Sequence, residues 1–428
     1  MKLTICLAFA IGIVTASVIA TPQVEAQVNG AGTSASSLFD TVINIPTSPD
    51  IVPGQSVGGV AGETTQVNLL DGGSIGTLTL LSGTELNVLG GTLGTSSRVE
   101  AGSELNVSGG STGTIIANQD SIVTVTGGST GTVFANDNST VSLLGGSPEG
   151  FQGRDDSTIN VNSVNFGPFA DTGAQGNSNL NISNTVIDRF FSFSSSGVLN
   201  FSSGNLGDNA DVGGGTVNIT GGVVGFNFNV NGDAVVNISD GDLEGISALG
   251  DSTLNIDGGT FEAIFASGGT ANITDAFVGD SFAGGGGLTV STGGVLNVSG
   301  GVFEDGLRNI FGGVLNISGG TFDRIDIDDE SIANLFGTDF AIDGELLEFT
   351  DSLTIVQRGG ETLTGILEDG SIFSLGLNPS TGGDATIDVV EPTATLTINR
   401  SAAVPEPGSA ILAFLAVAGL AGLRRRTN

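Results

Sequence analysis

Carboxylates are the side chains of this sequence best suited to chemistry, and they gather at two places. The larger cluster comprises Asp323, Arg324, Asp326, Asp328, Asp329 and Glu330, and the smaller one comprises Arg154, Asp155 and Asp156. Two facing carboxylates can serve a glycosidase as acid and base, and a polysaccharide lyase could use Ca²⁺ held by carboxylates. Within the larger cluster, weak Ca²⁺ binding is predicted at Asp326, Asp328 and Asp329.

Most other catalytic side chains are missing. The chain of 428 residues contains no histidine, tyrosine or tryptophan, and its only cysteine and only lysine, Cys6 and Lys2, lie in an N-terminal segment expected to be removed. Catalysis would rely on Asp, Glu, Ser, Thr and Arg, and a bound sugar could stack only on phenylalanine. This composition favours a non-catalytic protein without a cofactor, apart from weakly bound Ca²⁺. The alternative is a polysaccharide lyase, a glycosidase or a carbohydrate-binding protein.

The charge balance excludes another class of partner. Acidic residues number 45 against 11 basic ones, which gives a formal net charge of −34. Removal of residues 1–26 and of the tail from Gly408 leaves 44 acidic groups and seven arginines, hence a net charge of −37. A body this anionic repels nucleic acid and anionic lipid, so no nucleic-acid partner is expected.

One short phrase recurs through the middle of the chain and must position any site. It reads apolar, Asn, apolar, then Ser, Thr or Asp, and Gly-Gly often follows. Fifteen copies span 266 residues in 14 intervals, a mean spacing of 19 residues, which indicates a repeat architecture. The central positions are Asn68, Asn87, Asn106, Thr124, Ser142, Asn160, Asn181, Asn200, Asn218, Asn237, Asn255, Asn272, Asn297, Asn316 and Asn334.

This pattern predicts an all-β fold, a parallel β-helix of about 15 coils of 18–19 residues. Apolar and polar residues alternate within each phrase, as in a strand, and Gly-Gly turns the chain. The unequal spacing favours a right-handed coil, and the architecture is similar to short-repeat passenger domains and pectin-lyase-like solenoids. The flanking apolar residues should point inward, with further apolar slots at Phe261, Phe303 and Phe322. The asparagines should form a hydrogen-bonded ladder on the other face, at Asn87, Asn106, Asn181, Asn218, Asn237, Asn255, Asn297 and Asn316.

The N-terminus reads as a secretory signal peptide over residues 1–26. An apolar run from Leu3 to Ala20 follows Lys2, and a site of small residues at Val24 and Ala26 predicts cleavage between Ala26 and Gln27. Residues 27–60 are then an N-terminal cap or linker, 61–335 the solenoid and 336–403 a C-terminal β-rich cap that protects the last coil. The sequence therefore predicts an exported protein.

The C-terminus carries three parts in a fixed order. Val404, Pro405, Glu406 and Pro407 precede an apolar run from Ala410 to Leu423, and Arg424, Arg425 and Arg426 follow it. Fourteen apolar residues cover about 21 Å as a helix, a marginal span of a hydrocarbon core of about 30 Å. The order resembles the PEP-CTERM sorting signal of Gram-negative bacteria.

The resemblance assigns residues 404–428 to this signal, with a transmembrane helix at 409–423. It implies transient anchoring in the membrane, processing near Pro405 to Pro407 by an exosortase-type membrane protease, and a final place at the cell envelope, cell surface or extracellular matrix. Extracellular polysaccharide or other matrix proteins are then the expected partners.

Overall fold

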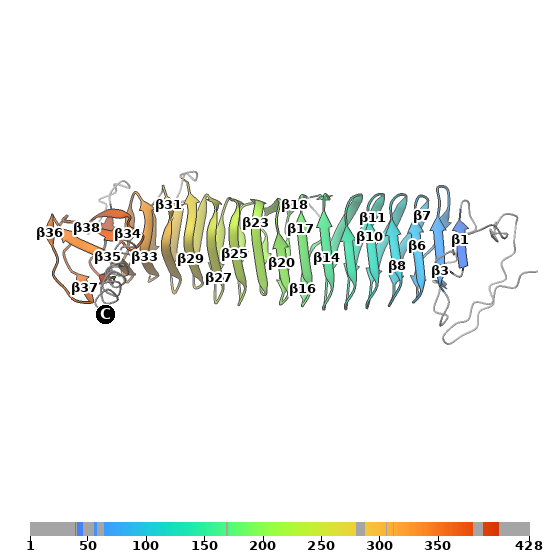
Figure 1. Cartoon of the computed structure of the whole chain (residues 1–428), viewed down its shortest axis with the longest axis horizontal. Coiled ribbons are helices and arrows are strands. Elements are labelled where there is room, and N and C mark those ends of the chain that lie inside the picture. The colour runs from blue at the N-terminus through green and yellow to red at the C-terminus, as the bar shows by residue number, and fades with distance from the viewer. Residues whose placement is uncertain are drawn as a thin grey trace, which may run out of the picture.

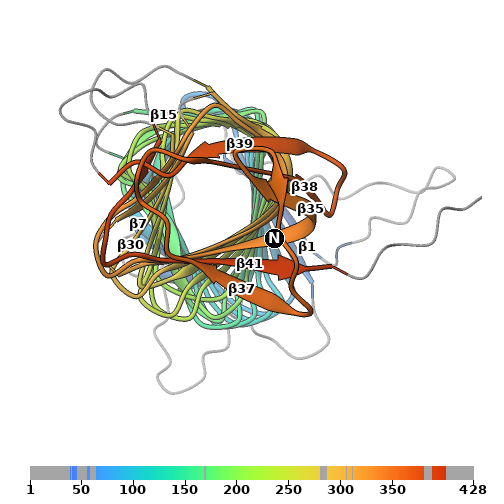
Figure 2. The same ribbon diagram turned by 90° about the vertical axis from the view of Figure 1, so that its left-hand side faces the viewer.

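The structure is a computed structural model that describes residues 39, 41–45, 55–57, 64–167, 170–279, 287–304, 306–310, 312–379 and 388–401. Every regular element within these ranges is a β-strand, and the strands stack into a long rod of parallel coils (Figure 1). Viewed along the rod, successive coils follow one common path (Figure 2). The predicted all-β parallel solenoid with a C-terminal β-cap is confirmed.

One face of the rod contains the repeated phrase of the sequence. Its strands pair in parallel, each with the next, in this order: β1 (Thr41–Ile45), β3 (Thr65–Leu69), β6 (Thr84–Val88), β8 (Glu104–Val107), β10 (Ile122–Val125), β12 (Thr140–Leu143), β14 (Thr158–Asn162), β17 (Asn179–Ser183), β20 (Val198–Phe201), β23 (Thr216–Val224), β25 (Val235–Leu243), β27 (Thr253–Phe261), β29 (Thr270–Val278), β31 (Val295–Phe303), β33 (Val314–Phe322), β35 (Ile332–Ile342) and β41 (Thr395–Arg400). We call this face the ladder face.

The register along the ladder face is unbroken. The fifteen predicted central positions pair with one another from Asn68 to Asn334, which encloses fourteen full turns. The column extends beyond the predicted copies, because Asn44 pairs with Asn68 and Thr397 pairs with Asn334. The repeated phrase therefore fixes a constant register in every coil.

A second sheet closes each coil. Its strands are β2 (Gln55–Val57), β4 (Ser74–Ile75), β5 (Leu78–Leu80), β7 (Thr92–Val99), β9 (Ser111–Ala117), β11 (Ser129–Ala135), β13 (Ser147–Gly153), β16 (Thr172–Gly176), β19 (Ser192–Ser195), β22 (Asp211–Val212), β24 (Phe228–Val230), β26 (Ile246–Leu249), β28 (Ala263–Ser267), β30 (Gly287–Ser291), β32 (Leu307–Ile310), β34 (Ile325–Ile327) and β40 (Val389–Val390). Between the two faces lie the short strands β15 (Asn165–Phe166), β18 (Thr185–Arg189) and β21 (Gly204–Asp208), each paired with the next. From β23 onward the second halves of the long strands occupy this position instead.

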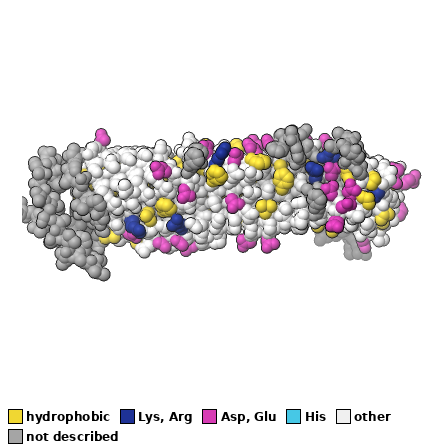
Figure 3. Space-filling view, turned by 180° about the vertical axis from the view of Figure 1, so that it is seen from behind, with side chains coloured by type: hydrophobic (Ala, Val, Ile, Leu, Met, Phe, Trp, Pro, Cys, Tyr) yellow, Lys and Arg dark blue, Asp and Glu magenta, His cyan; other side chains and the backbone are white. Residues whose placement is uncertain are grey.

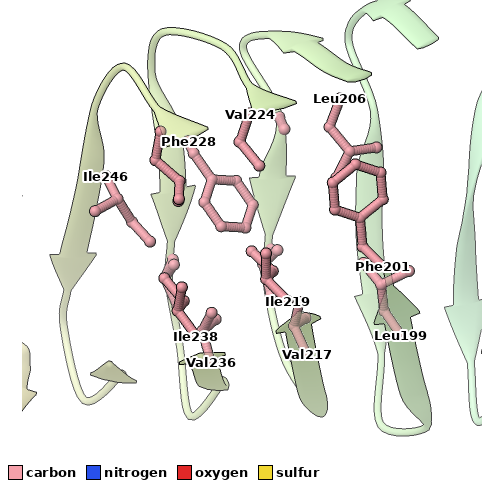
Figure 4. Packing of buried hydrophobic residues seen from close by; sticks show 14 of the residues in the cluster. Leu199, Phe201, Leu206, Val217, Ile219, Val224, Phe228, Val236, Ile238 and Ile246 are labelled. Carbon is pink, nitrogen blue, oxygen red and sulfur yellow. The ribbon is translucent and has the colours of Figure 1, made fainter. Parts of the chain in front are cut away.

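The interior is one continuous apolar core. The residues on either side of each ladder position point inward and stack on their counterparts, as Leu199, Val217 and Val236 do in one column (Figure 4). Phe201, Ile219 and Ile238 stack in the same way in the next column. All of these side chains are 2% exposed or less. Burial of apolar area at about 25 cal/mol per Å² stabilises the stack, so the inward direction predicted for these positions is confirmed.

In many coils the bend between the ladder face and the next face contains glycine. In β23 the register shifts after Ile219 and the chain passes through Gly221 and Gly222, with Gly222 at a φ of 93°. A Cβ atom at Gly222 would lie 2.7 Å from the ring of Phe201. In β23 the Gly-Gly of the repeat therefore serves both backbone conformation and close packing.

The predicted C-terminal cap covers the end of every face. On the ladder face, β37 (Ser352–Ile355) pairs antiparallel with β41. The far half of β35 pairs antiparallel with β36 (Glu345–Leu346) and with β38 (Thr362–Leu367), and β39 (Ile372–Gly376) pairs with β38. β40 lies in parallel on β34. Figure 2 shows β37, β38 and β39 around the end of the rod that faces the viewer.

Several predicted features lie outside the described residues. They are the cleavage site at Ala26 and Gln27, the tail from Val404 to Arg426 with its expected helix, and most of the insertion at 281–287. Within the described ranges, no helix is long and apolar enough to cross a membrane.

Candidate functional site

The larger acidic cluster centres on Asp326, on the outer side of β34. Asp326 is 8% exposed, and its register partner on β32 is Arg308. Its Oδ2 atom lies 3.3 Å from Nε of Arg324 and 3.7 Å from Nε of Arg308. Burial raises the pKa of Asp326, and the two guanidinium groups partly offset that effect. Asp326 is therefore a buried carboxylate between two cations.

Sequence reasoning missed a further member of this cluster. Asp388 accepts hydrogen bonds from the backbone N–H of Ile325 at 2.8 Å and from that of Gly376 at 2.7 Å. Burial raises the pKa of Asp388, while these bonds and Arg324 act in the opposite direction. Asp388 thus joins β34 of the last coils to β39 of the cap.

The other acids of the larger cluster do not gather around Asp326. Asp328, Asp329 and Glu330 form the corner that follows β34, and Asp329 accepts a hydrogen bond from the hydroxyl of Thr393. Burial raises the pKa of Asp328. Among the described residues, no group of three or more carboxylates converges as a metal site would. The arrangement gives the predicted Ca²⁺ site at Asp326, Asp328 and Asp329 no support, and the site stays a prediction.

The smaller cluster occupies the same corner in an earlier coil. Arg154, Asp155 and Asp156 lie between β13 and β14, and the guanidinium of Arg154 lies 5.1 Å from the ring centre of Phe134. Asp155 has a φ of 56°, a left-handed conformation that Asp tolerates in turns. A fully buried serine directly follows each cluster, Ser157 after Asp156 and Ser331 after Glu330. Turn geometry therefore explains the acidic residues of the two corners, Asp155 and Asp156 in one and Asp328 to Glu330 in the other.

The ladder predicted on the outer side of the repeat is present as hydrogen bonds. Where two asparagines are neighbours in the column, Nδ2 of the later one donates to Oδ1 of the one a coil earlier, as from Asn255 to Asn237 at 2.9 Å and from Asn316 to Asn297 at 2.7 Å. One run joins Asn44 to Asn106 and a second joins Asn160 to Asn334, with Thr124 between them in the same column.

A shallow groove follows part of this ladder. It crosses four coils at β23, β25, β27 and β29, which lie side by side in Figure 1. Its walls are two rows of side chains: the ladder residues Asn218, Asn237, Asn255 and Asn272, and the row two residues later, Thr220, Ser239, Asp257 and Thr274.

Acidic side chains dominate the charge of the surface. They are spread along the face of the rod shown in Figure 3 and are most frequent at its C-terminal end. Glu244 is one example, because burial and then the nearby carboxylates of Glu262, Asp208 and Asp242 raise its pKa. The surface therefore favours cations and uncharged molecules over anions.

No protein-family model matches the sequence, and no curated protein or solved structure matches it significantly.

Proposed function

We propose that this chain is a non-catalytic protein of the cell surface or extracellular matrix, exported through its signal peptide and processed at its PEP-CTERM-like tail. The observation that supports this best is the unbroken register of fifteen coils. At about 4.8 Å per strand the stack is about 70 Å long. A rod of this length is suited to spacing and to presenting a repetitive surface.

The acidic clusters support a structural role. The corners at Arg154 to Asp156 and at Asp328 to Glu330 turn the coil, and Asp388 fastens the cap through backbone hydrogen bonds. These side chains have packing and turn roles, which account for their positions without catalysis. The cap itself shields the last strand edges from pairing with other chains.

The enzyme alternative has its best candidate in Asp326. A raised pKa in a buried carboxyl is typical of a general acid, so a glycosidase or lyase would use this residue. Two arginines lie against it, however, and both oxygens of Asp388 accept backbone hydrogen bonds. A glycosidase needs two carboxyl groups that both face the sugar, and this geometry favours the structural role.

The tail provides the experimental test. In the native host, Pro405→Ala combined with Glu406→Ala should give an unprocessed precursor held in the membrane, because the protease no longer reads its signal. Deletion of residues 408–428 should leave folding intact and release the protein early. Processing and distribution of the double variant like the wild type would contradict the sorting assignment.

A further inference from the structure

We propose that the groove along the ladder between Asn218 and Asn272 binds an extended, uncharged polysaccharide chain. This inference depends on the proposed function, and it adds the site and the ligand class. The groove crosses four coils in a straight line, since the register along β23, β25, β27 and β29 keeps each row of side chains in one column.

The ladder amides in the groove retain hydrogen-bonding capacity. A side-chain amide has two N–H donors and an oxygen with two lone pairs. Within the described chain, Asn218, Asn237 and Asn255 each donate one hydrogen bond, to the asparagine of the preceding coil. One N–H of each amide is therefore left for a ligand. All three residues are partly exposed.

In the N-terminal run of the same ladder, the second N–H is already occupied. Asn87 donates to Asn68 at 3.0 Å and also to Oε1 of Glu85 at 2.6 Å. Asn106 donates to Asn87 at 3.2 Å and also to Oε1 of Glu104 at 3.0 Å. In the groove, the residue two positions before each asparagine is Thr216, Val235, Thr253 or Thr270, none of which carries a carboxylate. The groove thus lies in the later section of the ladder, from Asn181 to Asn334, where each amide donates only to the asparagine of the preceding coil and its second N–H has no acceptor within the described chain.

A second row adds three hydroxyl groups and one carboxylate beside the amides. Thr220, Ser239, Asp257 and Thr274 are exposed, and the hydroxyl of Thr274 donates to Oδ1 of Asp257 at 2.6 Å. Both rows repeat at the strand spacing of about 4.8 Å, which is comparable to the advance of one sugar in an extended chain. Sugar hydroxyls both donate and accept, so each sugar can pair with one coil.

The charge of the protein selects an uncharged chain. The mature body has a net charge of −37, and Asp257 lies in the groove wall. An acidic polysaccharide would be repelled, whereas a neutral one meets no electrostatic repulsion from the protein. A straight row of donors also fits a straight β-linked chain better than a coiled one.

The test compares two matched pairs of substitutions in the exported full-length chain. Asn237→Thr with Asn255→Thr changes the groove, and Asn87→Thr with Asn106→Thr changes the ladder outside it. Thr124 occupies the same column between Asn106 and Ser142, so the fold already accommodates threonine in this position. Circular dichroism and thermal unfolding would verify that both variants retain the solenoid.

Titration calorimetry with cellohexaose, mannohexaose and xylohexaose would measure binding, with hexagalacturonate as the charged counterpart. We expect at least one neutral chain to bind, the charged chain to bind more weakly, and the groove variant to lose about tenfold in affinity, since two hydrogen bonds are removed. The control variant should stay within about twofold of the wild type.

Two results would overturn the inference, and they leave the proposed function standing. One is binding of a neutral chain that both variants retain equally, which would place the ligand elsewhere on the surface. The other is no binding of any of the three neutral chains. Failure of the proposed function is seen separately, in the processing and location of the protein.

Discussion

Nδ2 of Asn255 lies 2.9 Å from Oδ1 of Asn237, and the offset of 18 residues between the two positions is one coil. Their neighbours Leu254 and Val236 are paired on the inner side and are fully buried. One short phrase thus provides both an outer hydrogen-bonded column and an inner apolar one. The two columns make unequal contributions to stability, because one is partly solvated and the other is dry.

Replacement of an inward residue should cost far more than replacement of its outward neighbour. Leu254→Asp or Ile256→Asp places a carboxylate in the apolar core and should cost more than about 4 kcal/mol or prevent folding. Asn255→Ala removes two ladder bonds and should cost about 1–2 kcal/mol. Urea unfolding monitored by circular dichroism would measure both. A larger loss for Asn255→Ala would reverse the assignment of the two faces.

Substitution of alanine for glycine at a bend should lower stability for two reasons that can be measured separately. Gly293→Ala introduces a Cβ at a φ of 73° with no atom within 4 Å, and should cost about 1 kcal/mol from conformation alone. Gly222→Ala adds a clash with the ring of Phe201 and should cost a further ~1–3 kcal/mol. Thermal unfolding of the two variants would compare them, and equal losses would show that the clash at Gly222 is relieved freely.

Stability should increase as the pH falls from the alkaline side through the raised pKa values of the buried carboxyl groups. Burial raises the pKa of five carboxyl groups in the folded protein, at Glu244, Asp326, Asp328, Asp388 and Glu391. Their reference values are 3.8 for Asp and 4.5 for Glu. Between the reference value and the raised value the folded state binds more protons than the unfolded state. The free energy of unfolding therefore decreases as pH rises through this window, and the loss is complete above the raised pKa values.

Glu244→Gln isolates one part of this effect. The substitution removes a charge from a group of like charges with Glu262, Asp208 and Asp242, so it should raise the melting temperature at about pH 8. The gain should fade toward acidic pH, where Glu244 is protonated in the wild type. A gain that is the same at both ends of the pH range would show that electrostatics is not its cause.

The repeat made the solenoid predictable from sequence, whereas its ends were harder to predict. In a stack of coils each position meets its own counterpart, so the spacing of Asn68 to Asn334 determines the register directly. Ile43-Asn44-Ile45 and Leu396-Thr397-Ile398 show the same alternation, but Ser- and Pro-rich sequence and the fading repeat concealed them. The strands at the cap core, β39 and β40, have no repeated signal.

The surroundings of Asp326 could not be predicted from sequence. Asp388 hydrogen-bonds to Ile325, which lies 63 residues earlier, and no repeated phrase relates the two positions. Arg308 meets Asp326 because they are 18 residues apart, one coil, and that spacing was a usable signal. The contact is visible only when residues one coil apart are compared, since the two side chains are not neighbours along the chain.

Purified protein should show no hydrolase or lyase activity on neutral or acidic polysaccharides. The two arginines beside Asp326 and the turn roles of the remaining acids provide the physical reason. Release of reducing ends and of unsaturated products would both be measured, with Asp326→Ala and Asp328→Ala as companion variants. Activity that these substitutions abolish, while the fold is retained, would overturn the structural interpretation.

The location and the termini of the mature protein test the central proposal most directly. Mass spectrometry of cytoplasmic, envelope and matrix fractions from the producing cells would identify both. We expect a chain that begins at Gln27, has lost Arg424 to Arg426 by cleavage near Pro405 to Pro407, and is found in the envelope or matrix. A chain that retains Lys2 and Arg426 and is found in the cytoplasm would contradict the proposal.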